Sequence, residues 1–222
     1  MNAFSKKNKI ALFMLPLLTH GGGAEAYFID LARNLCERGF QADIITADEK
    51  LYSIFARWLH IFTRFNFFGK IDISGRESEK DISDRLGKAR WMKLSYKDIK
   101  KRLGKYDIVY AKNEIVDLTL LKSLGYNQLP PIVVGVHTPL FYPDRKLFSS
   151  KIHNFMYTGF LYRWLLKGVK CIHVSNLATK EFVDKNFNVK SRLIYYPFSV
   201  DEVNSLAAKF KAKIVFEKEK FN

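Results

Sequence analysis

The chain has 222 residues, of which 48% are hydrophobic and 27% charged, a composition typical of a folded globular domain and unlike disordered or collagen-like chains. The formal net charge of +15 attracts phosphates, anionic lipid head groups or nucleic acid. The basic residues are scattered from Lys6 to Lys220, and no zinc-finger or RNA-binding motif accompanies them, so we expect no nucleic-acid partner.

The amino-terminal segment imitates a signal peptide, because lysines precede the apolar run 10–18 and residues 24–26 read Ala-Glu-Ala. Pro16 interrupts that run, and the same residues suit a buried first strand, a glycine turn and the start of a helix, so we reject the signal peptide. No stretch reaches the roughly 18 apolar residues of a membrane span. Cys36 and Cys171 are isolated, as in a reducing compartment, which predicts a cytoplasmic protein, peripheral at the inner membrane face if it contacts lipid.

Short apolar runs recur between helical patterns. The runs are Ile10–Leu15, Ala42–Thr46, Asp107–Tyr110, Ile132–Val136, Cys171–Val174 and Leu193–Tyr195. They lack polar alternation, as expected when helices cover both faces of a sheet. The sequence therefore predicts an α/β fold with a doubly wound, Rossmann-like parallel sheet.

Four further segments carry a helical or charged pattern. Residues 24–37 place apolar side chains on one helical face, and Gly39 supplies a left-handed stop. Residues 51–62 form an amphipathic, aromatic stripe, with Tyr52, Arg57 and His60 away from it. Residues 74–102 are polar with weak periodicity and are predicted to be an insertion or a mobile loop, and residues 150–167 are predicted to form one long helix.

A glycine-rich turn separates the first predicted strand from the first helix. It reads Thr19-His20-Gly21-Gly22-Gly23-Ala24-Glu25. Glycines let backbone N–H groups approach a phosphate, and the helix N-terminus adds a partial positive charge at the same place. The turn lacks the G-x-G-x-x-G spacing of dinucleotide sites and the Gly-Lys-Ser/Thr of a P-loop. It is either an anion cradle or a structural turn without a ligand.

Several segments of the chain form a recognisable series. They are the lysine-led first strand with its Gly-Gly-Gly-Ala-Glu turn, the strand 106–113, the strand 133–139 that ends in a histidine, the strand 171–175 that ends in a serine, and the connection 193–201. Together they resemble family 4 glycosyltransferases of the GT-B fold. These segments occur in the family's order over about residues 8–204. The resemblance implies one half of a GT-B fold.

The same resemblance suggests roles for individual residues. Gly22 and Gly23 would lie against the donor diphosphate, and His137 would lie in the cleft near the transferred sugar as the candidate catalytic residue. His137 also follows an apolar strand, where open α/β sheets bind ligands, although a capping or core histidine remains an alternative. Glu25 is either a substrate contact or a first-turn acid favourable to the helix dipole. Ser175 is either a substrate contact or an ordinary N-cap.

The chain departs from the family pattern in several places. Lys112 replaces a common histidine, and Tyr196 and Pro197 stand where the family often has Asn and Gly or Pro. The paired glutamates eight positions apart that mark the family's donor-binding half do not occur. We expect residues 1–208 to form the amino-terminal domain and residues 209–222 to be the truncated start of a missing carboxyl-terminal domain, or a tail.

The leading hypothesis is therefore the acceptor-side domain of a retaining, nucleotide-sugar-dependent glycosyltransferase of hexosyltransferase type. It would be inactive without a carboxyl-terminal half, which could be a separate chain. Its expected partners are a nucleotide sugar and a sugar or lipid-linked acceptor, with no metal or cofactor. The alternatives are a non-catalytic module at an anionic membrane surface, motivated by the 51–62 stripe with Arg57 and Arg64, and a different nucleotide-binding protein. A dehydrogenase is disfavoured, although Asp48 lies near the position of a ribose ligand.

Overall fold

The computed structural model describes residues 8–15, 18–20, 23–54, 78–137, 139–142 and 148–195, without the side chains of His20 and Ser149. Several sequence predictions lie outside these residues. They are the role of Gly22, most of the 51–62 stripe with Arg57 and Arg64, and the boundary between 1–208 and 209–222.

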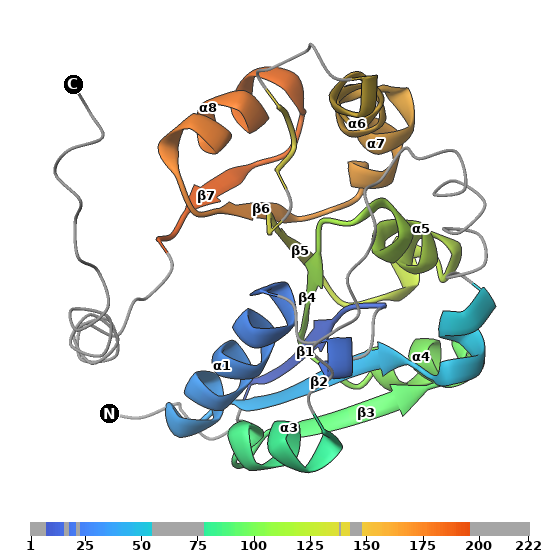
Figure 1. The fold of residues 1–222 in the computed structure, drawn as a ribbon, viewed down its shortest axis with the longest axis vertical. Coiled ribbons are helices and arrows are strands. Elements are labelled where there is room, and N and C mark those ends of the chain that lie inside the picture. Colours follow the sequence, from blue (N-terminus) through green and yellow to red (C-terminus); the bar gives the residue numbers. More distant parts are fainter. Residues whose placement is uncertain are drawn as a thin grey trace, which may run out of the picture.

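Seven parallel strands of the described residues form one sheet in the order β3-β2-β1-β4-β5-β6-β7 (Figure 1). The strands are β1 (Lys9–Phe13), β2 (Gln41–Ala47), β3 (Arg90–Leu94), β4 (Ile108–Lys112), β5 (Ile132–Gly135), β6 (Cys171–Val174) and β7 (Ser191–Leu193). All six predicted strands are present, with bounds within two residues of those expected. The doubly wound, Rossmann-like fold is confirmed.

Helices connect the strands and cover both faces of the sheet. They are α1 (Gly23–Glu37), α3 (Glu79–Leu86), α4 (Tyr96–Leu103), α5 (Ile115–Ser123), α6 (Phe148–Thr158), α7 (Phe160–Leu166) and α8 (Leu177–Asn186), with short 3-10 turns at Leu18–His20 and Tyr126–Gln128. None of the helices in the described part of the chain has the length and hydropathy needed to cross a lipid bilayer.

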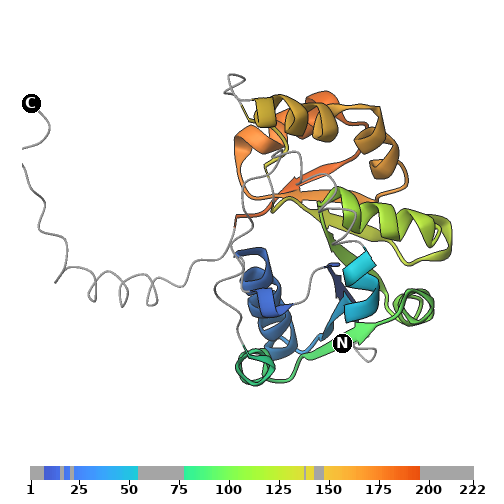
Figure 2. The same cartoon turned by 45° about the vertical axis from the view of Figure 1, so that its right-hand side comes forward.

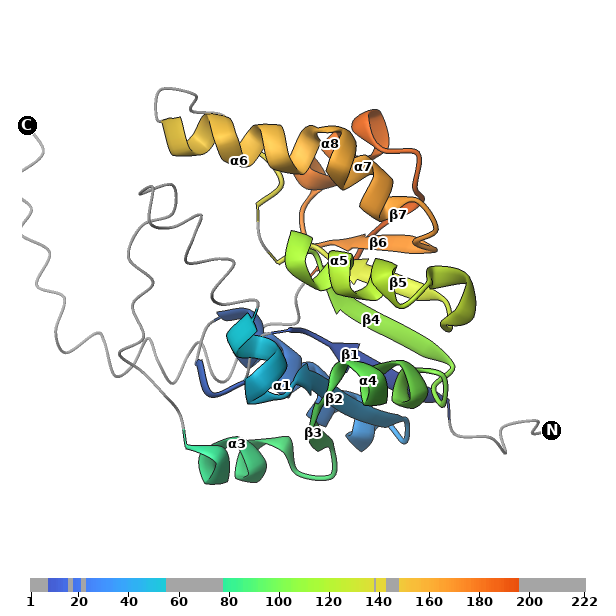
Figure 3. The ribbon, with the colours of Figure 1, turned by 90° about the vertical axis from the view of Figure 1, so that its right-hand side faces the viewer.

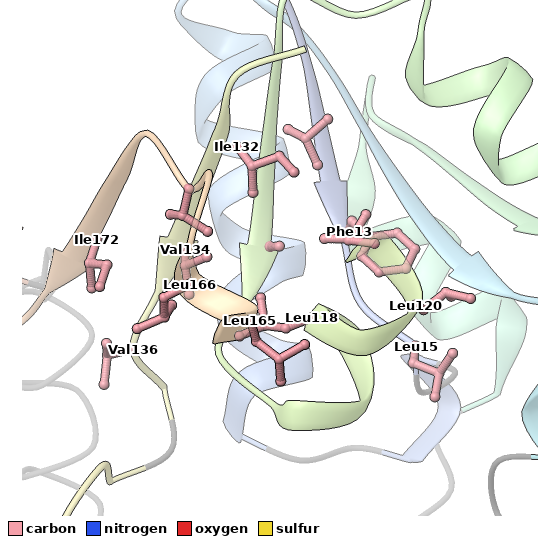
Figure 4. Packing of buried hydrophobic residues seen from close by; sticks show 14 of the residues in the cluster. Phe13, Leu15, Leu118, Leu120, Ile132, Val134, Val136, Leu165, Leu166 and Ile172 are labelled. Carbon is pink, nitrogen blue, oxygen red and sulfur yellow. The ribbon is translucent and has the colours of Figure 1, made fainter. Parts of the chain in front are cut away.

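The two faces of the sheet carry separate hydrophobic clusters. On one face α1 and α3 pack on alternate side chains of the strands, among them Leu12 and Ile44. On the other face α4, α5, α7 and α8 pack on the intervening side chains, such as Phe13 and Val134. Figure 2 shows α1 and α4 on opposite sides of the strands, and Figure 4 shows leucines of α5 and α7 beside Phe13 and Val134. The period of two in a strand explains this division.

Helix α1 matches the sequence prediction closely. Phe28 and Ala32 are buried, and Leu31 and Leu35 pack against the same cluster. The helix stops at Glu37, and Gly39 has a φ of 89°, a left-handed conformation that favours glycine. This helix places its N-terminus at the carboxyl edge of the sheet, directly after the glycine turn.

The prediction that residues 74–102 form an insertion or loop is wrong for the described residues 78–102. They form α3, β3 and the greater part of α4. β3 is an edge strand and only partly buried, so it keeps polar side chains: Arg90 forms an ion pair with Asp43 of β2 at 2.7 Å. The short helices read as polar because each buries only one narrow stripe, for example Ile99 and Leu103 of α4.

The prediction of a single helix over residues 150–167 is also wrong. The chain forms α6 and α7 (Figure 3), and Gly159 between them has an extended conformation. A Cβ atom at Gly159 would lie 2.4 Å from the carbonyl oxygen of Phe155, which explains why glycine occupies the break. The break turns a new set of side chains inward, so that Leu165 is fully buried while Phe155 and Phe160 are exposed.

The described start of the 51–62 stripe differs from its prediction in two side chains. Residues 49–54 are helical, and the Asp48 carboxylate caps this helix by accepting a hydrogen bond from the Leu51 N–H at 2.7 Å. Tyr52, expected on the polar side, packs against the core, whereas Ile54 is 45% exposed. The packing of this turn on the sheet, rather than its helical periodicity, decides which side chains are covered.

Candidate functional site

The carboxyl ends of the parallel strands meet at one edge of the sheet, and the polar residues of interest lie there. The strand order changes direction between β1 and β4, because β1 is followed by β2 on one side and β3 is followed by β4 on the other. Such a switch point is where open α/β sheets bind ligands. The N-terminus of α1 and the residues that follow β4 and β5 converge at this place.

His137 follows β5 at this edge and is held on several sides. Its backbone N–H donates to the Asn113 Oδ1 at 2.9 Å, which joins the ends of β4 and β5. Its ring centroid lies 4.5 Å from that of Tyr27 and 5.5 Å from that of Phe28, both on α1. Its Nε2 lies 3.1 Å from the Tyr110 hydroxyl oxygen.

The ring of His137 is neutral at neutral pH. Burial lowers the pKa of His137 to about 3, and the nearby His173 and Lys112 add to this effect. The ring therefore offers one N–H donor and one nitrogen acceptor, with no charge. This chemistry suits hydrogen bonding to a hydroxyl group better than attraction of an anion.

The glycine turn is described only in part. Gly23 is the first residue of α1, is exposed, and has no atom within 4 Å of the position that a Cβ would take. Open space beside the first backbone N–H groups of a helix allows a phosphate to approach them. Gly22 lies outside the described residues, so its expected contact with a diphosphate stays a prediction.

Lys112, at the end of β4, lies among carboxylates at the same edge. Its Nζ is 4.0 Å from the Glu25 Oε1 and 3.6 Å from the Glu114 Oε1. Burial alone would lower the pKa of Lys112, but Glu114, Asp117 and Glu25 outweigh it and raise the pKa, so the ammonium stays charged. Glu25 is thus both a first-turn acid of α1 and a partner of Lys112.

Asp117 on α5 is a residue that sequence reasoning missed. It is fully buried, and its Oδ1 accepts a hydrogen bond from the Leu15 N–H just beyond β1. Its Oδ2 has no hydrogen-bond partner among the described residues. Burial raises the pKa of Asp117 to about 8, while Lys112 opposes the rise. The available signal was a lone acid between the apolar residues Val116 and Leu118.

The remaining predicted residues have simpler surroundings. Ser175 follows β6 at the same edge and is half-buried, but the N-cap of α8 is Asn176, whose side chain accepts from the Thr179 N–H at 2.7 Å. The N-cap interpretation of Ser175 is therefore wrong, and its substrate contact stays a prediction. Within the described ranges, no group of three or more His, Cys, Asp or Glu side chains is arranged to hold a metal ion.

The site so described brings together His137, Glu25 and the start of α1, with Lys112, Asn113 and Asp117 as additions. The residues come from β4, α1, α5 and the end of β5, far apart in sequence. A neutral histidine, a helix N-terminus and a buried ammonium side by side can bind a polar ligand that carries both hydroxyl groups and phosphate.

Comparisons with known proteins agree with this architecture. A search of curated proteins finds no match. Among solved structures, HepE from Anabaena in complex with UDP-glucose is 15% identical with a TM-score of 0.53, and the match covers 91% of this chain and 50% of that one. The chain thus spans half the length of the HepE chain, and at this identity the likeness shows the fold alone, that of one half of a GT-B glycosyltransferase.

A second structure, sucrose-phosphate synthase from Thermosynechococcus elongatus, is 11% identical with a TM-score of 0.44, over 91% of this chain and 97% of that one. That score is too low to support any conclusion. The sequence profile of Glycosyltransferase Family 4 matches residues 21–202, which is most of the chain. The protein therefore belongs to glycosyltransferase family 4.

Proposed function

We propose that this chain is the acceptor-side half of a retaining glycosyltransferase that uses a nucleotide sugar, and that catalysis requires a second, donor-binding half. The observation that carries the proposal is the family match over residues 21–202, together with the half-length match to HepE, a protein solved with UDP-glucose. Because such a cleft is formed by two halves, the polar edge described above would supply one wall of it.

In this proposal the donor diphosphate lies against Gly22, Gly23 and the N-terminus of α1, whose partial positive charge stabilises the leaving group. His137 lies near the transferred sugar and exchanges a hydrogen bond with a hydroxyl of the donor or acceptor. Glu25 and Ser175 are candidate substrate contacts. The residues position the reactants and stabilise developing charge, which are the effects that matter when no covalent chemistry falls to the protein.

The first test is to sequence the coding region beyond codon 222 and to look for a Rossmann-like half with glutamates eight positions apart. The chain is then assayed for sugar transfer from UDP-glucose and other nucleotide sugars, alone and with that half. We expect turnover only with both halves, and a loss of roughly 100-fold in kcat for His137→Ala. Normal turnover by the chain alone would contradict the need for a second half.

A second candidate function, contact with an anionic membrane surface, is favoured by the outer side of α6 and α7. Phe155 and Phe160 are 78% and 85% exposed, and Phe148, Leu161 and Trp164 are also exposed. Residues 148–170 contain four lysine or arginine residues and no acidic one. Exposed aromatic rings with basic neighbours are typical of surfaces that bind anionic bilayers. We call the five exposed apolar residues the α6–α7 face. The two functions are compatible.

Co-sedimentation with vesicles tests this contact. We expect binding to vesicles that contain phosphatidylserine, weaker binding to neutral vesicles, and loss of binding in the double variant Phe155→Gln, Phe160→Gln. Leu177→Gln is the matched control, because Leu177 is 56% exposed on α8, outside the α6–α7 face. If the protein fails to bind anionic vesicles at low salt, the membrane function is wrong.

A further inference from the structure

A chain of hydrogen bonds crosses three neighbouring strands behind His137. The His137 Nε2 lies 3.1 Å from the hydroxyl oxygen of Tyr110 on β4. The same oxygen lies 2.8 Å from the Nδ1 of His173 on β6. The His173 Nε2 lies 2.9 Å from the carbonyl oxygen of Ile194, just after β7. These hydrogen bonds thus connect the candidate catalytic ring to the polypeptide backbone just after β7, the strand at one edge of the sheet.

The chemistry of each group sets the direction of every bond in this chain. A carbonyl oxygen only accepts, so the His173 Nε2 carries the proton and donates to Ile194. In a neutral imidazole the other nitrogen is then an acceptor, so the His173 Nδ1 accepts from the Tyr110 hydroxyl. That hydroxyl has one proton, so its oxygen must accept from the His137 Nε2–H.

Both rings are neutral, which this assignment requires. Burial lowers the pKa of His173, although the hydrogen bond to Ile194 opposes the shift. A protonated His173 would instead donate to Tyr110 and would reverse the bond to His137. The neutral state of His173 therefore decides which nitrogen of His137 carries its proton.

Packing holds the three groups at these distances. A Cβ at Gly135 would lie 1.9 Å from the Tyr110 hydroxyl oxygen and 2.7 Å from the His137 Nε2, so the hydroxyl fills the space that any other residue would need. Tyr27 and Phe28 of α1 cover the His137 ring, and Tyr110 packs in the same cluster. The contact between hydroxyl and ring is thus built into the sheet.

We propose that Tyr110 and His173 are positioning residues that hold His137 as the neutral Nε2–H tautomer, which makes Nδ1 the nitrogen that accepts a hydrogen bond. In the proposed glycosyltransferase, on which this last step rests, the Nδ1 accepts from a substrate hydroxyl. The ring therefore recognises a hydroxyl donor rather than a phosphate oxygen, which only accepts.

The direct test is nuclear magnetic resonance of the ¹⁵N-labelled full chain, which distinguishes protonated from unprotonated ring nitrogens. At neutral pH we expect Nε2 protonated and Nδ1 unprotonated in both His137 and His173. An Nδ1–H tautomer, or a rapid mixture of tautomers, in the unaltered protein would overturn the proposal. This measurement does not depend on any variant that fails to fold.

Variants test whether the chain of bonds causes the tautomer. Tyr110→Phe and His173→Leu should each leave His137 as a mixture, whereas His173→Asn keeps an acceptor for the Tyr110 hydroxyl and should restore the single tautomer. Tyr106→Phe is the matched control, because it removes a buried hydroxyl that donates to Asp43 at 2.7 Å, remote from His137. If His137 keeps one tautomer in both Tyr110→Phe and His173→Leu, the positioning role is wrong.

An assay of sugar transfer, with this protein and its second half combined, distinguishes a failure of this inference from a failure of the proposed function. Tyr110→Phe should lower kcat about 10-fold. This is the lower end of the loss seen when the hydrogen-bond partners of metal-ligating histidines are removed. If the tautomer is as assigned and His137→Ala leaves transfer unchanged, the proposed function of His137 fails and the inference stands. If His137→Ala abolishes transfer but the tautomer differs, the inference fails and the function stands.

Discussion

Two regions of the molecule reverse the usual distribution of residue types. At the carboxyl edge of the sheet, polar side chains are buried: Asn113 and Asp117 have no exposed surface. On the α6–α7 face, Phe155 and Phe160 keep 78% and 85% of their surface exposed. Burying polar groups is costly unless they find partners, and exposing large aromatic groups forgoes hydrophobic stabilisation. Both arrangements therefore point to function rather than to stability.

The two regions also differ in how they are tied to the fold. The buried edge is cross-linked by hydrogen bonds, such as the one from His137 to Asn113, which joins the ends of β5 and β4, and the one from Leu15 beyond β1 to Asp117 on α5. The rings of Phe155 and Phe160 point away from the core. Changes at the edge should therefore cost stability and alter pH dependence, whereas changes on the α6–α7 face should leave the fold intact.

The largest effect is expected from the buried side of the helix that carries the exposed face. Leu165→Ala should lower the free energy of unfolding by about 3 kcal/mol, because it leaves a cavity under α7. The control Leu161→Ala, at a residue 50% exposed, should change it by less than about 0.5 kcal/mol. Urea denaturation measures both, and equal losses would mean that the two sides of α7 do not differ.

A smaller loss is expected at Gly135 in the buried edge. Gly135→Ala should lower the free energy of unfolding by about 2 kcal/mol, because its Cβ would overlap the Tyr110 hydroxyl. Gly104→Ala is the control, since its nearest neighbour is 3.7 Å from the new Cβ and its φ is −61°. It should be neutral or stabilising by up to about 1 kcal/mol. A neutral Gly135→Ala variant would refute the close contact.

Asp117, in the buried edge, should make the free energy of unfolding depend on pH. Substitutions on the α6–α7 face should not have this effect. Its pKa rises from 3.8 to about 8 on folding, so the folded state holds a proton that the unfolded state releases. Stability from this group is fully present below about pH 4 and is lost as the pH rises toward about 8.

Asp117→Asn keeps the acceptor for Leu15 but cannot titrate, so it serves as the reference. Relative to this variant, the unaltered protein should lose about 1 kcal/mol of unfolding free energy for each unit by which the pH rises near neutrality. Denaturation curves at about pH 6.5 and 7.5 measure the difference. The neighbours Lys112, Glu114 and Glu25 are present in both proteins, so a constant difference would mean that Asp117 is ionised at both pH values.

The smallest effect on stability is expected from the α6–α7 face itself. The double variant Phe155→Gln, Phe160→Gln should keep its free energy of unfolding within about 0.5 kcal/mol for each substitution. Phe28→Gln, at a fully buried ring of α1, is the contrasting control and should cost about 3 kcal/mol. A large loss in the double variant would show that the exposed rings support the fold, which would weaken the membrane function.

Sequence periodicity predicts well those elements that are either buried on both faces or apolar on one face only. The buried central strands are continuous apolar runs, and α1 has one apolar face with a glycine stop, so both were predictable. β3 was missed because an edge strand keeps Arg90 and Lys93 in contact with solvent and partners. The break at Gly159 was missed because the flanking residues are apolar all round and hide the change of direction.

The residues of the candidate site likewise divide into those that the sequence could locate and those that it could not. His137 and the glycine turn could be located from sequence, because His137 comes shortly after β5, the turn lies between β1 and α1, and the carboxyl edge of a parallel sheet is where ligands bind. Tyr110 and His173 could not be found, since they read as ordinary members of apolar strands. Asp117 was missed as well, because its one local signal, a lone acid among apolar residues, does not show that the side chain is buried.

By itself, the sequence determined the fold class and the family and predicted the edge of the sheet that carries the candidate site, because these follow from short-range patterns repeated along the chain. Only the tertiary structure decided which polar groups meet there, since Tyr110 on β4, His173 on β6 and His137 just after β5 are brought together by the order and register of these strands. It also decided which aromatic residues of α6 and α7 stay outside, because the turn at Gly159 depends on packing against the sheet.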